Sequence, residues 1–546
     1  MAKINPLIFR AYDIRGIAMS TSEVDKQRNP PELDLTPKTA NLIGRGTATY
    51  LKRAYGVRNM LVGRDNRLHS ENLHEAFIQG VLATGVDVTD VGLSTSPLIY
   101  YGVCKFGFDS GVNITASHNP KQYNGIKIVG QNAHSICGDE LQKILKIIEN
   151  DDFETAIDKT NTNKKPHRSQ KTFNNKTSTD SNTATPARTR PNTSNGTAKS
   201  ITTTTTIAGA TINTAPLTTA TTTSAILTKK TDNFQTYLAD IASRVKIARK
   251  MKVVVDAGNG TAGIFAPDLI KAIGCEVIPL YCEPDGNFPN HEANPEEEKN
   301  MKDLSEAVLR HHADLGIGFD GDGDRVGIVD EKGRHYSADY LLILLARELL
   351  ENRPKSQIVF DVKVSRILID EITRLGGVPV MSRTGHSFIE TRMHELNAPL
   401  AGEISGHLFF GKDFYNYYGF DDATFAACKI VEIISKSNKT FSAHFNDLPK
   451  MATTPEFKAH CPDDRKFEIV KDLTSHFKQL YDCVTIDGVR VNFDDKSWGA
   501  VRCSNTSPNL TLRFEAPNQK RLSEIQAIMA EELKKYPEVS LDWYRP

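Results

Sequence analysis

The residues best suited to chemistry are three acidic side chains on alternate positions of one short segment. Asp320, Asp322 and Asp324 are separated only by glycine, and they directly follow an expected strand over 314–319. Gly321 and Gly323 admit backbone angles that are closed to other residues, so a loop can turn all three carboxylates inward. Three hard oxygen ligands suit Mg²⁺, which keeps its other coordination positions for water or phosphate. The segment predicts a magnesium site, and the simpler alternative is a solvated acidic turn.

A calcium loop of the EF-hand type is a second alternative for the same segment. Counted from Asp320, the twelfth position holds Glu331, as such a loop requires, but the sixth holds Arg325 where the loop needs glycine. The residues that follow, 326–329, have the composition of a strand. These features argue against an EF-hand.

A serine far upstream is a candidate nucleophile. Ser117 follows an expected strand over 111–115 and precedes His118, Asn119 and the turn-favouring Pro120. Taken alone, it is a turn serine with a polar neighbour. Beside a divalent cation its hydroxyl can carry phosphate, because the metal neutralises the oxygens of a dianionic phosphoryl group. The serine and the aspartates together indicate phosphoryl transfer.

Two further loops carry polar groups that suit a phosphorylated sugar. Glu403, Ser405 and His407 alternate, so an extended loop would present all three on one side, where they could bind vicinal sugar hydroxyls. Arg502 opens the segment 502–508, in which one arginine and several short polar side chains can form a phosphate cradle. For the segment 502–508, a polar loop before the strand over 510–515 is the alternative.

Apolar runs alternating with helix-like stretches position these loops. We expect strands over 252–257, 277–281, 314–319, 326–330, 357–362 and 378–382. We expect helices ending at 273 and over 301–312, 338–350 and 366–375. This alternation predicts α/β units with mostly parallel strands. Near the C-terminus, strands over 484–491 and 510–515 and an amphipathic helix over 521–536 indicate a separate, smaller α+β domain.

Composition limits the function classes. A chain of 546 residues predicts three or four domains of about 100–200 residues each. Its formal net charge of zero gives no general attraction to nucleic acid or membranes. We see neither a signal peptide nor an apolar stretch near the ~18 residues that span a bilayer. We therefore expect a cytoplasmic protein with no nucleic-acid or membrane partner.

Residues 155–232 break the alternating pattern. They are rich in Thr, Asn, Ser and Ala, and residues 161–230 hold ten Lys or Arg but a single acid, Asp180. Apolar side chains are too sparse to offset a backbone ordering cost of ~1–2 kcal/mol per residue. We predict a disordered insertion on a surface connection. A basic tether for an acidic partner is the alternative, and the sequence does not identify such a partner.

The order and sequences of the four loops resemble the α-D-phosphohexomutases, most closely their bacterial phosphomannomutase/phosphoglucomutase branch. The resemblance extends to segments 10–16, 123–127 and 383–386, and it covers nearly the whole chain outside the insertion. It implies three similar mixed α/β domains and a smaller C-terminal α+β domain around a central cleft. The implied boundaries are 1–154 for domain 1, 155–232 for the insertion, 233–345 for domain 2, 346–450 for domain 3 and 451–546 for domain 4.

The resemblance also implies a role for each loop. Ser117 would be the phosphoserine and, with Asp320, Asp322 and Asp324, a ligand of Mg²⁺. Glu403 and Ser405 would bind sugar hydroxyls, with His407 nearby. The groups gripping the phosphate that is not transferred would be Arg502, Ser504, Asn505 and Thr506. The residues lining the cleft would be Arg15, Lys127, Arg325, Lys363 and His386, with Lys127 and His386 as candidates for proton transfer.

The implied activity is reversible conversion of a hexose 1-phosphate to its 6-phosphate, with a hexose 1,6-bisphosphate as intermediate and activator. Ile404 stands where a phosphoglucosamine mutase typically has Gln, which favours mannose and glucose phosphates. Ala116 departs from the Gly usual in the closest branch and leaves the nucleophile intact. The alternatives are a phosphoglucosamine mutase, a bisphosphate synthase, and a non-catalytic sugar-phosphate sensor or scaffold.

Overall fold

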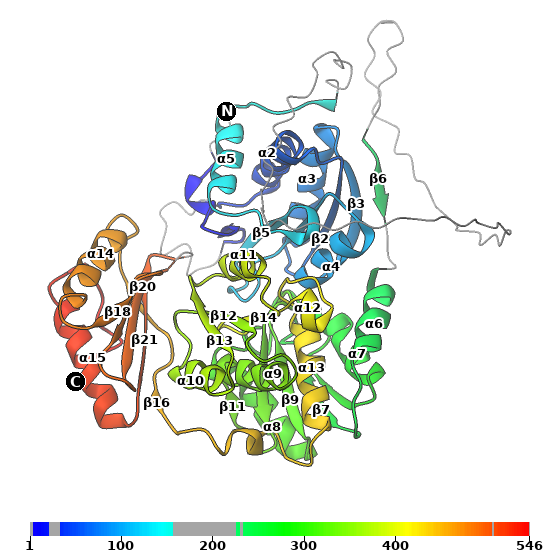
Figure 1. Cartoon of the computed structure of the whole chain (residues 1–546). Helices are drawn as coiled ribbons and strands as arrows, with labels where there is room; N and C mark the ends of the chain where they lie inside the picture. Colours follow the sequence, from blue (N-terminus) through cyan, green and yellow to red (C-terminus); the bar gives the residue numbers. More distant parts are fainter. Residues whose placement is uncertain (1–3, 21–32, 157–224, 230–232, 505–506, 545–546) are drawn as a thin grey trace, which may run out of the picture. The chain divides into compact units, whose positions relative to one another are not determined.

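The computed structural model describes residues 4–20, 33–156, 225–229, 233–504 and 507–544. Their strands form four sheets, each accompanied by its own helices (Figure 1). The architecture is the expected one, with three mixed α/β domains followed by an α+β domain. Asn505, Thr506 and most of the insertion lie outside the described residues.

Domain 1 contains a six-stranded sheet in the order β1-β5-β4-β2-β3-β6. The strands are β1 (Ile14–Ile17), β2 (Asn59–Arg64), β3 (Asp87–Leu93), β4 (Ser110–Ile114), β5 (Tyr123–Val129) and β6 (Leu227–Lys229). The helices are α2 (Pro37–Tyr55), α3 (Ser70–Ala83), α4 (Ser96–Phe106) and α5 (Asp139–Glu149). β2 runs parallel to β3 and β4, whereas β5 is antiparallel to β4. The carboxyl ends of β2 and β4 therefore meet at one edge, where the Ser117 loop begins.

Domain 2 contains a five-stranded sheet in the order β11-β10-β9-β7-β8. The strands are β7 (Lys252–Asp256), β8 (Glu276–Leu280), β9 (Leu315–Phe319), β10 (Val326–Asp330) and β11 (His335–Tyr336). The helices are α6 (Asn233–Arg244), α7 (Ala266–Ala272) and α8 (Lys302–His311). β9 is parallel to β7 and antiparallel to β10, so the three aspartates lie on the connection between β9 and β10.

Domain 3 contains a four-stranded sheet in the order β13-β12-β14-β15. The strands are β12 (Gln357–Asp361), β13 (Val378–Ser382), β14 (Leu400–Gly402) and β15 (Leu408–Phe410). The helices are α9 (Ala338–Asn352), α10 (Arg366–Arg374), α11 (His386–Leu396), α12 (Lys412–Tyr415) and α13 (Ala423–Ser435). The antiparallel pair β14 and β15 encloses the 403–407 loop.

Domain 4 contains a fully antiparallel sheet in the order β16-β21-β20-β19-β18, with β17 also paired to β21. The strands are β16 (Ala452–Thr453), β17 (Phe457–His460), β18 (Asp482–Val484), β19 (Val489–Asn492), β20 (Trp498–Cys503) and β21 (Asn509–Ala516). The helices α14 (Lys466–Phe477) and α15 (Gln519–Leu533) pack on this sheet (Figure 1). The Arg502 segment connects β20 to β21.

The cores explain how the domains are joined. One buried apolar cluster combines residues of domains 1, 2 and 3, including Leu98, Phe265 and Phe360. Domain 4 has a separate cluster that includes Phe514. Contacts between domain 4 and domain 3 include polar ones: Arg490 Nη1, for example, donates to the carbonyl oxygens of Val362 and Val364 at 2.7 and 2.8 Å. None of the helices in the described part of the chain combines the length and apolar character that crossing a membrane requires.

Outside the candidate site, the structure differs from three sequence expectations. The strand expected over 484–491 is a hairpin of β18 and β19, turned at Gly488, whose φ of +68° lies in the left-handed region that favours glycine. The domain boundary expected at 345/346 lies inside α9, which is one continuous helix. Leu227–Lys229, assigned to the disordered insertion, forms β6 and extends the sheet of domain 1 by pairing with β3.

Candidate active site

Ser117 lies in a tight turn directly after β4. The amide of Ser117 donates to the Thr115 hydroxyl at 2.9 Å, and the amide of Asn119 donates to the Ala116 carbonyl at 3.0 Å. Ser117 has a φ of +52°, a left-handed conformation that costs a residue other than glycine of order 1–3 kcal/mol. Its side chain is buried, and the hydroxyl contacts His118 Nδ1 at 3.2 Å. The surrounding structure therefore holds a candidate nucleophile in a strained conformation.

The Ser117 hydroxyl meets the aspartate loop of domain 2. It donates to Asp320 Oδ2 at 2.6 Å, while Asp320 Oδ1 accepts from the amides of Asp324 and Arg325 at 3.0 and 3.1 Å. The other two carboxylates belong to the same cluster, because oxygen atoms of Asp320, Asp322 and Asp324 lie within 4.8 Å of one another. The three aspartates are fully buried. The residue types suggested a serine beside the metal loop, and the family resemblance predicted the same meeting of serine and aspartates.

Glycine is required in the aspartate loop for two separate reasons. Gly323 has a φ of +74°, which favours glycine. Gly321 faces the serine turn so closely that a Cβ atom there would lie 2.5 Å from the carbonyl oxygen of Ser117. The two loops can pack together because Gly321 carries no side chain, and Gly323 allows the backbone turn within the aspartate loop.

The aspartate cluster fits a divalent cation. Asp322 Oδ1 and Asp324 Oδ1 are buried and have no hydrogen-bond partner in the described part of the chain, which is costly for carboxylate oxygens unless a cation is near. Lys127 Nζ lies 2.9 Å from Asp322 Oδ2 and also pairs with Asp324, so it supplies one of the balancing charges. Burial, followed by the charges of Asp324 and Asp322, raises the pKa of Asp320 well above its ordinary value. A further cation would relieve this repulsion, and oxygen ligands of this kind suit Mg²⁺.

Ser96 is a residue of this centre that the sequence analysis missed. It lies at the first position of α4, where its hydroxyl donates to Asp322 Oδ2 at 2.5 Å and its amide donates to the Asp322 carbonyl at 2.9 Å. Asn113 Nδ2 donates to the Ser96 hydroxyl at 3.0 Å. A serine before a proline resembles any helix start, so no local signal marks this role.

The 403–407 loop is a turn and not the extended segment that we expected. The Gly406 amide donates to the Glu403 carbonyl at 3.1 Å, and Gly406 has a φ of +99°. Glu403 and His407 are buried, whereas Ser405 is half-buried. Glu403 Oε1 accepts from the Gly385 amide at 2.5 Å, beside His386. This hydrogen bond therefore links the Glu403 side chain to the start of α11.

A buried carboxylate that the sequence did not suggest orients His407. His407 Nδ1 contacts Asp421 Oδ2 at 2.6 Å, and Arg325 Nε donates to His407 Nε2 at 3.0 Å. Since Nε2 accepts this bond, the proton of the ring lies on Nδ1 and is donated to Asp421. The His386 and His407 rings stack with centroids 5.5 Å apart. Burial, aided by the charge of Lys127, lowers the pKa of His386 well below its ordinary value, so this ring is neutral.

The Arg502 segment presents an unpaired donor. Arg502 Nε donates to Asp487 Oδ2 at 2.7 Å, whereas its buried Nη2 has no hydrogen-bond partner among the described residues. Lys466 Nζ supports the loop by donating to the carbonyls of Ser504 and Ser507 at 2.7 and 3.1 Å. A free guanidinium donor beside a serine loop is what a phosphate group would engage.

The remaining expected residues are buried in ion pairs. Arg15 pairs with Asp13, and Lys363 pairs with Glu456. The cluster in direct contact comprises Ser117, Lys127, Asp320, Asp322 and Asp324, and the second cluster comprises Arg325, His407 and Asp421. Arg502 makes its side-chain hydrogen bonds within domain 4, to Asp487 and Thr511. Two of the expected phosphate-binding residues, Asn505 and Thr506, lie outside the described residues.

Comparison with known proteins gives four consecutive family matches. Three are described as phosphoglucomutase/phosphomannomutase, alpha/beta/alpha domain I over residues 6–155, domain II over 234–333 and domain III over 337–452. The fourth is described as phosphoglucomutase/phosphomannomutase, C-terminal domain, and covers 456–532. Together they cover most of the chain outside the insertion.

Full-length relatives and a solved structure agree with these matches. The chain is 36% identical over 528 residues to a phosphomannomutase/phosphoglucomutase of Pseudomonas aeruginosa, covering 96% of this chain and 95% of the relative. It is 34% identical to a phosphoglucomutase of Neisseria gonorrhoeae, covering 96% of each. The crystal structure of a phosphoglucomutase/phosphomannomutase family protein from Burkholderia thailandensis aligns with a TM-score of 0.77 and 32% identity, covering 98% of both chains.

Proposed function

The chain belongs to the phosphoglucomutase/phosphomannomutase family, and from this premise we propose that it interconverts hexose 1-phosphates and hexose 6-phosphates with Ser117 as its phosphoryl carrier. The observation that carries the proposal is the 2.6 Å hydrogen bond from the Ser117 hydroxyl to Asp320, inside a buried cluster of three carboxylates. A sugar-phosphate sensor or scaffold would need neither a phosphoryl carrier nor a metal site.

In the proposed cycle, phosphorylated Ser117 transfers its phosphoryl group to the free hydroxyl of a bound hexose phosphate. The Ser117 Oγ–phosphorus bond breaks, a sugar oxygen–phosphorus bond forms, and the hydroxyl gives up its proton. The product is a hexose 1,6-bisphosphate, which turns round in the site. Its other phosphoryl group then returns to Ser117, and the hexose phosphate isomer leaves. A small amount of added bisphosphate would phosphorylate Ser117 and so act as activator.

Each group has a role in this cycle. Asp320, Asp322 and Asp324, together with the Ser117 oxygen, would hold Mg²⁺, which neutralises charge on the transferred phosphoryl group. Lys127 and His386 are the candidates for moving the hydroxyl proton, and neutral His386 is able to accept one. The groups assigned to the sugar hydroxyls and to the phosphate that is not transferred are Glu403, Ser405, His407, Lys363, Arg502, Ser504, Asn505 and Thr506. Arg15 and Arg325 would contribute positive charge.

Mannose and glucose phosphates are the proposed substrates, because Ile404 stands between Glu403 and Ser405. The test is a coupled mutase assay with the 1-phosphates of glucose, mannose and glucosamine, in Mg²⁺ and a trace of bisphosphate. Turnover of glucose and mannose 1-phosphates with the larger kcat/KM values is expected. Absence of turnover with all three would contradict a mutase, a preference for glucosamine would contradict the sugar assignment, and released bisphosphate as the main product would indicate a bisphosphate synthase.

A further inference from the structure

One buried arginine of domain 1 hydrogen-bonds along most of the Ser117 turn. Arg67, on the connection between β2 and α3, is 2% exposed. Its Nη2 donates to the carbonyl oxygens of Ser117 and Asn119 at 2.7 and 2.6 Å. Its Nη1 donates to those of Pro120 and Tyr123 at 2.8 and 3.2 Å. A single guanidinium therefore holds four carbonyl groups within seven consecutive residues.

The guanidinium is itself held in one orientation. Arg67 Nε donates to Asp65 Oδ2 at 3.1 Å, so all three nitrogen atoms of the group are engaged. Asp65 Oδ1 accepts from the Arg67 amide at 3.1 Å and from the Ser70 hydroxyl. Because a guanidinium is planar and its donors are fixed in a fork, this arrangement determines where the four carbonyl oxygens lie. A lysine, with its three donors on one nitrogen, cannot span them.

The hydrogen bonds of Arg67 constrain the Ser117 backbone, whose conformation is strained. With a φ of +52°, Ser117 keeps a conformation that residues other than glycine adopt only when their surroundings impose it. The carbonyl oxygen that Arg67 holds is the one packed against Gly321 of the aspartate loop. The peptide plane at Ser117 also sets the direction of its Cα–Cβ bond, and hence where the hydroxyl points.

The residue before Arg67 connects the same segment to domain 2. Asn66 Nδ2 donates to the Asn259 carbonyl at 2.7 Å, and the Thr261 hydroxyl donates to Asn66 Oδ1 at 3.1 Å. The amide of Thr261 in turn donates to the carbonyl of Gly321 at 2.9 Å. One residue of the segment thus contacts the serine turn, while its neighbour contacts a loop that supports the aspartates.

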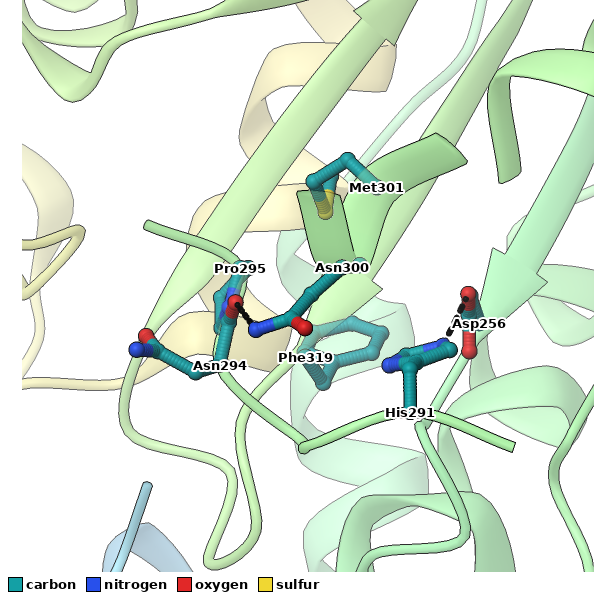
Figure 2. A pocket seen from close by; sticks show the side chains of 8 residues that line it. Asp256, His291, Asn294, Pro295, Asn300, Met301 and Phe319 are labelled. Atoms are coloured by element: carbon teal, nitrogen blue, oxygen red, sulfur yellow. Dashed lines mark hydrogen bonds and ion pairs between the residues drawn. The ribbon is translucent and has the colours of Figure 1, made fainter. Parts of the chain in front are cut away.

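Hydrogen bonds from neighbouring residues hold the 257–260 loop of domain 2 in place. Asp256 Oδ1 accepts from the Gly258 amide at 2.8 Å, and Asp256 Oδ2 accepts from His291 Nε2 at 3.1 Å. Figure 2 shows the His291 ring turned toward Asp256. Asn290 Nδ2 donates to Asn259 Oδ1 at 2.8 Å. The loop that Asn66 contacts is therefore itself held in place by hydrogen bonds within domain 2.

We propose that Arg67 is a positioning residue for phosphoryl transfer: it holds the Ser117 turn in the conformation that directs the hydroxyl at the aspartates, and Asn66 locks the same segment to domain 2. The role in catalysis rests on the mutase activity proposed above, whereas the control of the turn's conformation does not. The Arg67 guanidinium hydrogen-bonds to backbone carbonyls and to Asp65, and it lies over the Phe288 ring at 5.3 Å from the ring centroid. These contacts are all within the protein, so Arg67 acts through Ser117 and not on the substrate.

The test compares Arg67→Lys and Arg67→Ala with matched changes at Arg64 in the full chain. Arg64 lies three residues earlier and donates to the Asp65 carbonyl and pairs with Glu71, so it does not support the serine turn. Misplacing a reacting group by about 1 Å costs about 10²-fold in rate. We expect the Arg67 variants to lose about 10²-fold in kcat, with KM for glucose 1-phosphate within about threefold, because substrate contacts persist. Arg64 variants keep the wild-type kcat, and methylguanidinium partly restores Arg67→Ala.

Hydrogen exchange tests the positioning claim without reference to turnover. Amides in the peptide 115–124 should exchange faster in the Arg67 variants than in wild type and in Arg64→Lys. Unchanged exchange, an unchanged kcat, or equal losses in the Arg64 variants would overturn the proposal. A wild-type protein without mutase turnover would contradict the proposed function and the catalytic role, and the exchange data would still decide whether Arg67 orders the turn. If Arg67→Ala is insoluble, Arg67→Lys and Asn66→Ala provide the same comparison.

Discussion

The Ser117 hydroxyl donates a 2.6 Å hydrogen bond to Asp320, although 203 positions separate these residues in the chain. They belong to different domains, and each follows a strand of its own sheet. The candidate reaction centre therefore exists only when domain 1 packs on domain 2. The shared apolar core of domains 1–3 provides the stability for that packing.

Replacing Ser117 with alanine removes the hydroxyl that we propose as the phosphoryl carrier. We expect Ser117→Ala to abolish mutase turnover while glucose 1-phosphate binding, followed by calorimetry, persists. Intact mass after incubation with bisphosphate should show one added phosphate on the wild type and none on the variant. Ser475→Ala, on the exposed side of α14, is the control. Near-normal turnover of Ser117→Ala at saturating bisphosphate would reject the role.

The Oδ1 atoms of Asp322 and Asp324, which lack hydrogen-bond partners among the described residues, predict that Mg²⁺ stabilises the folded protein. An ion that binds only the folded chain adds about 2.7 kcal/mol of stability at 100 times its Kd, so Mg²⁺ should raise the Tm of the wild type. Asp322→Asn should lose this rise, because an amide carries no charge to attract the ion. Chelation should stop turnover, and added Mg²⁺ should restore it. The exposed Asp472→Asn is the control, and an equal Tm rise in Asp322→Asn would contradict the metal site.

The close approach of Gly321 to the Ser117 carbonyl predicts that adding one methyl group at position 321 lowers activity severely. A Cβ atom 2.5 Å from that oxygen forces the two loops apart, so we expect Gly321→Ala to lower kcat by about 10²-fold. In Gly130→Ala the nearest atom lies 3.5 Å away, and this variant should retain wild-type kcat. Steady-state kinetics and the Tm of both variants decide the matter. Equal activity in the two alanine variants would show that the loops tolerate separation.

The raised pKa of Glu390, in α11, predicts that the folding stability of the protein depends on pH. Burial raises the pKa of Glu390 to about 8, against the lowering effect of a hydrogen bond from Ser135 of domain 1. The folded state thus holds a proton that the unfolded state releases at lower pH. Stability should be fully present below the ordinary pKa of glutamate and fall as pH rises towards 8, by at most about 1.4 kcal/mol per pH unit.

The matched variant is Glu390→Gln, which keeps an acceptor for Ser135 and cannot ionise. Among its neighbours, Asp421 opposes ionisation of Glu390, and His394 lies 3.8 Å away. Between pH 5 and 8 the Tm of wild type should fall relative to that of Glu390→Gln; these limits approximate the ordinary and raised pKa values. Parallel Tm profiles of the two proteins would show that Glu390 does not titrate in this range.

The unpaired Nη2 of Arg502 predicts a specific binding defect. Lysine keeps the charge but cannot reproduce the fork, and losing a hydrogen bond to a charged group costs about 1.5–3 kcal/mol. Arg502→Lys should therefore raise KM for glucose 1-phosphate by about 10–100-fold, with a smaller change in kcat. Arg521→Lys, on the surface of α15, is the control. An unchanged KM would remove Arg502 from the phosphate site.

Some of the site could be predicted from local sequence, and some could not. The glycine-spaced aspartates predicted a metal loop from local sequence alone. The strands Val326–Asp330 and Val378–Ser382 occur at the predicted positions, because alternation and apolar runs are local properties. Ser96, Asp421 and Arg67 left no such signal. Their roles come from contacts with residues up to 226 positions away, and a serine, an aspartate or an arginine in a polar segment usually faces solvent.

The sequence by itself determined which chemistry is available: a hydroxyl in a turn, three carboxylates kept close by glycines, and loops at the ends of strands. Only the tertiary structure decided that Ser117 meets Asp320, that Lys127 balances the buried carboxylates, and that Arg67 holds the serine turn. The physical reason is that spacing along a chain governs local geometry. Contacts between domains depend on how whole sheets pack, which sums many weak apolar interactions that no short segment encodes.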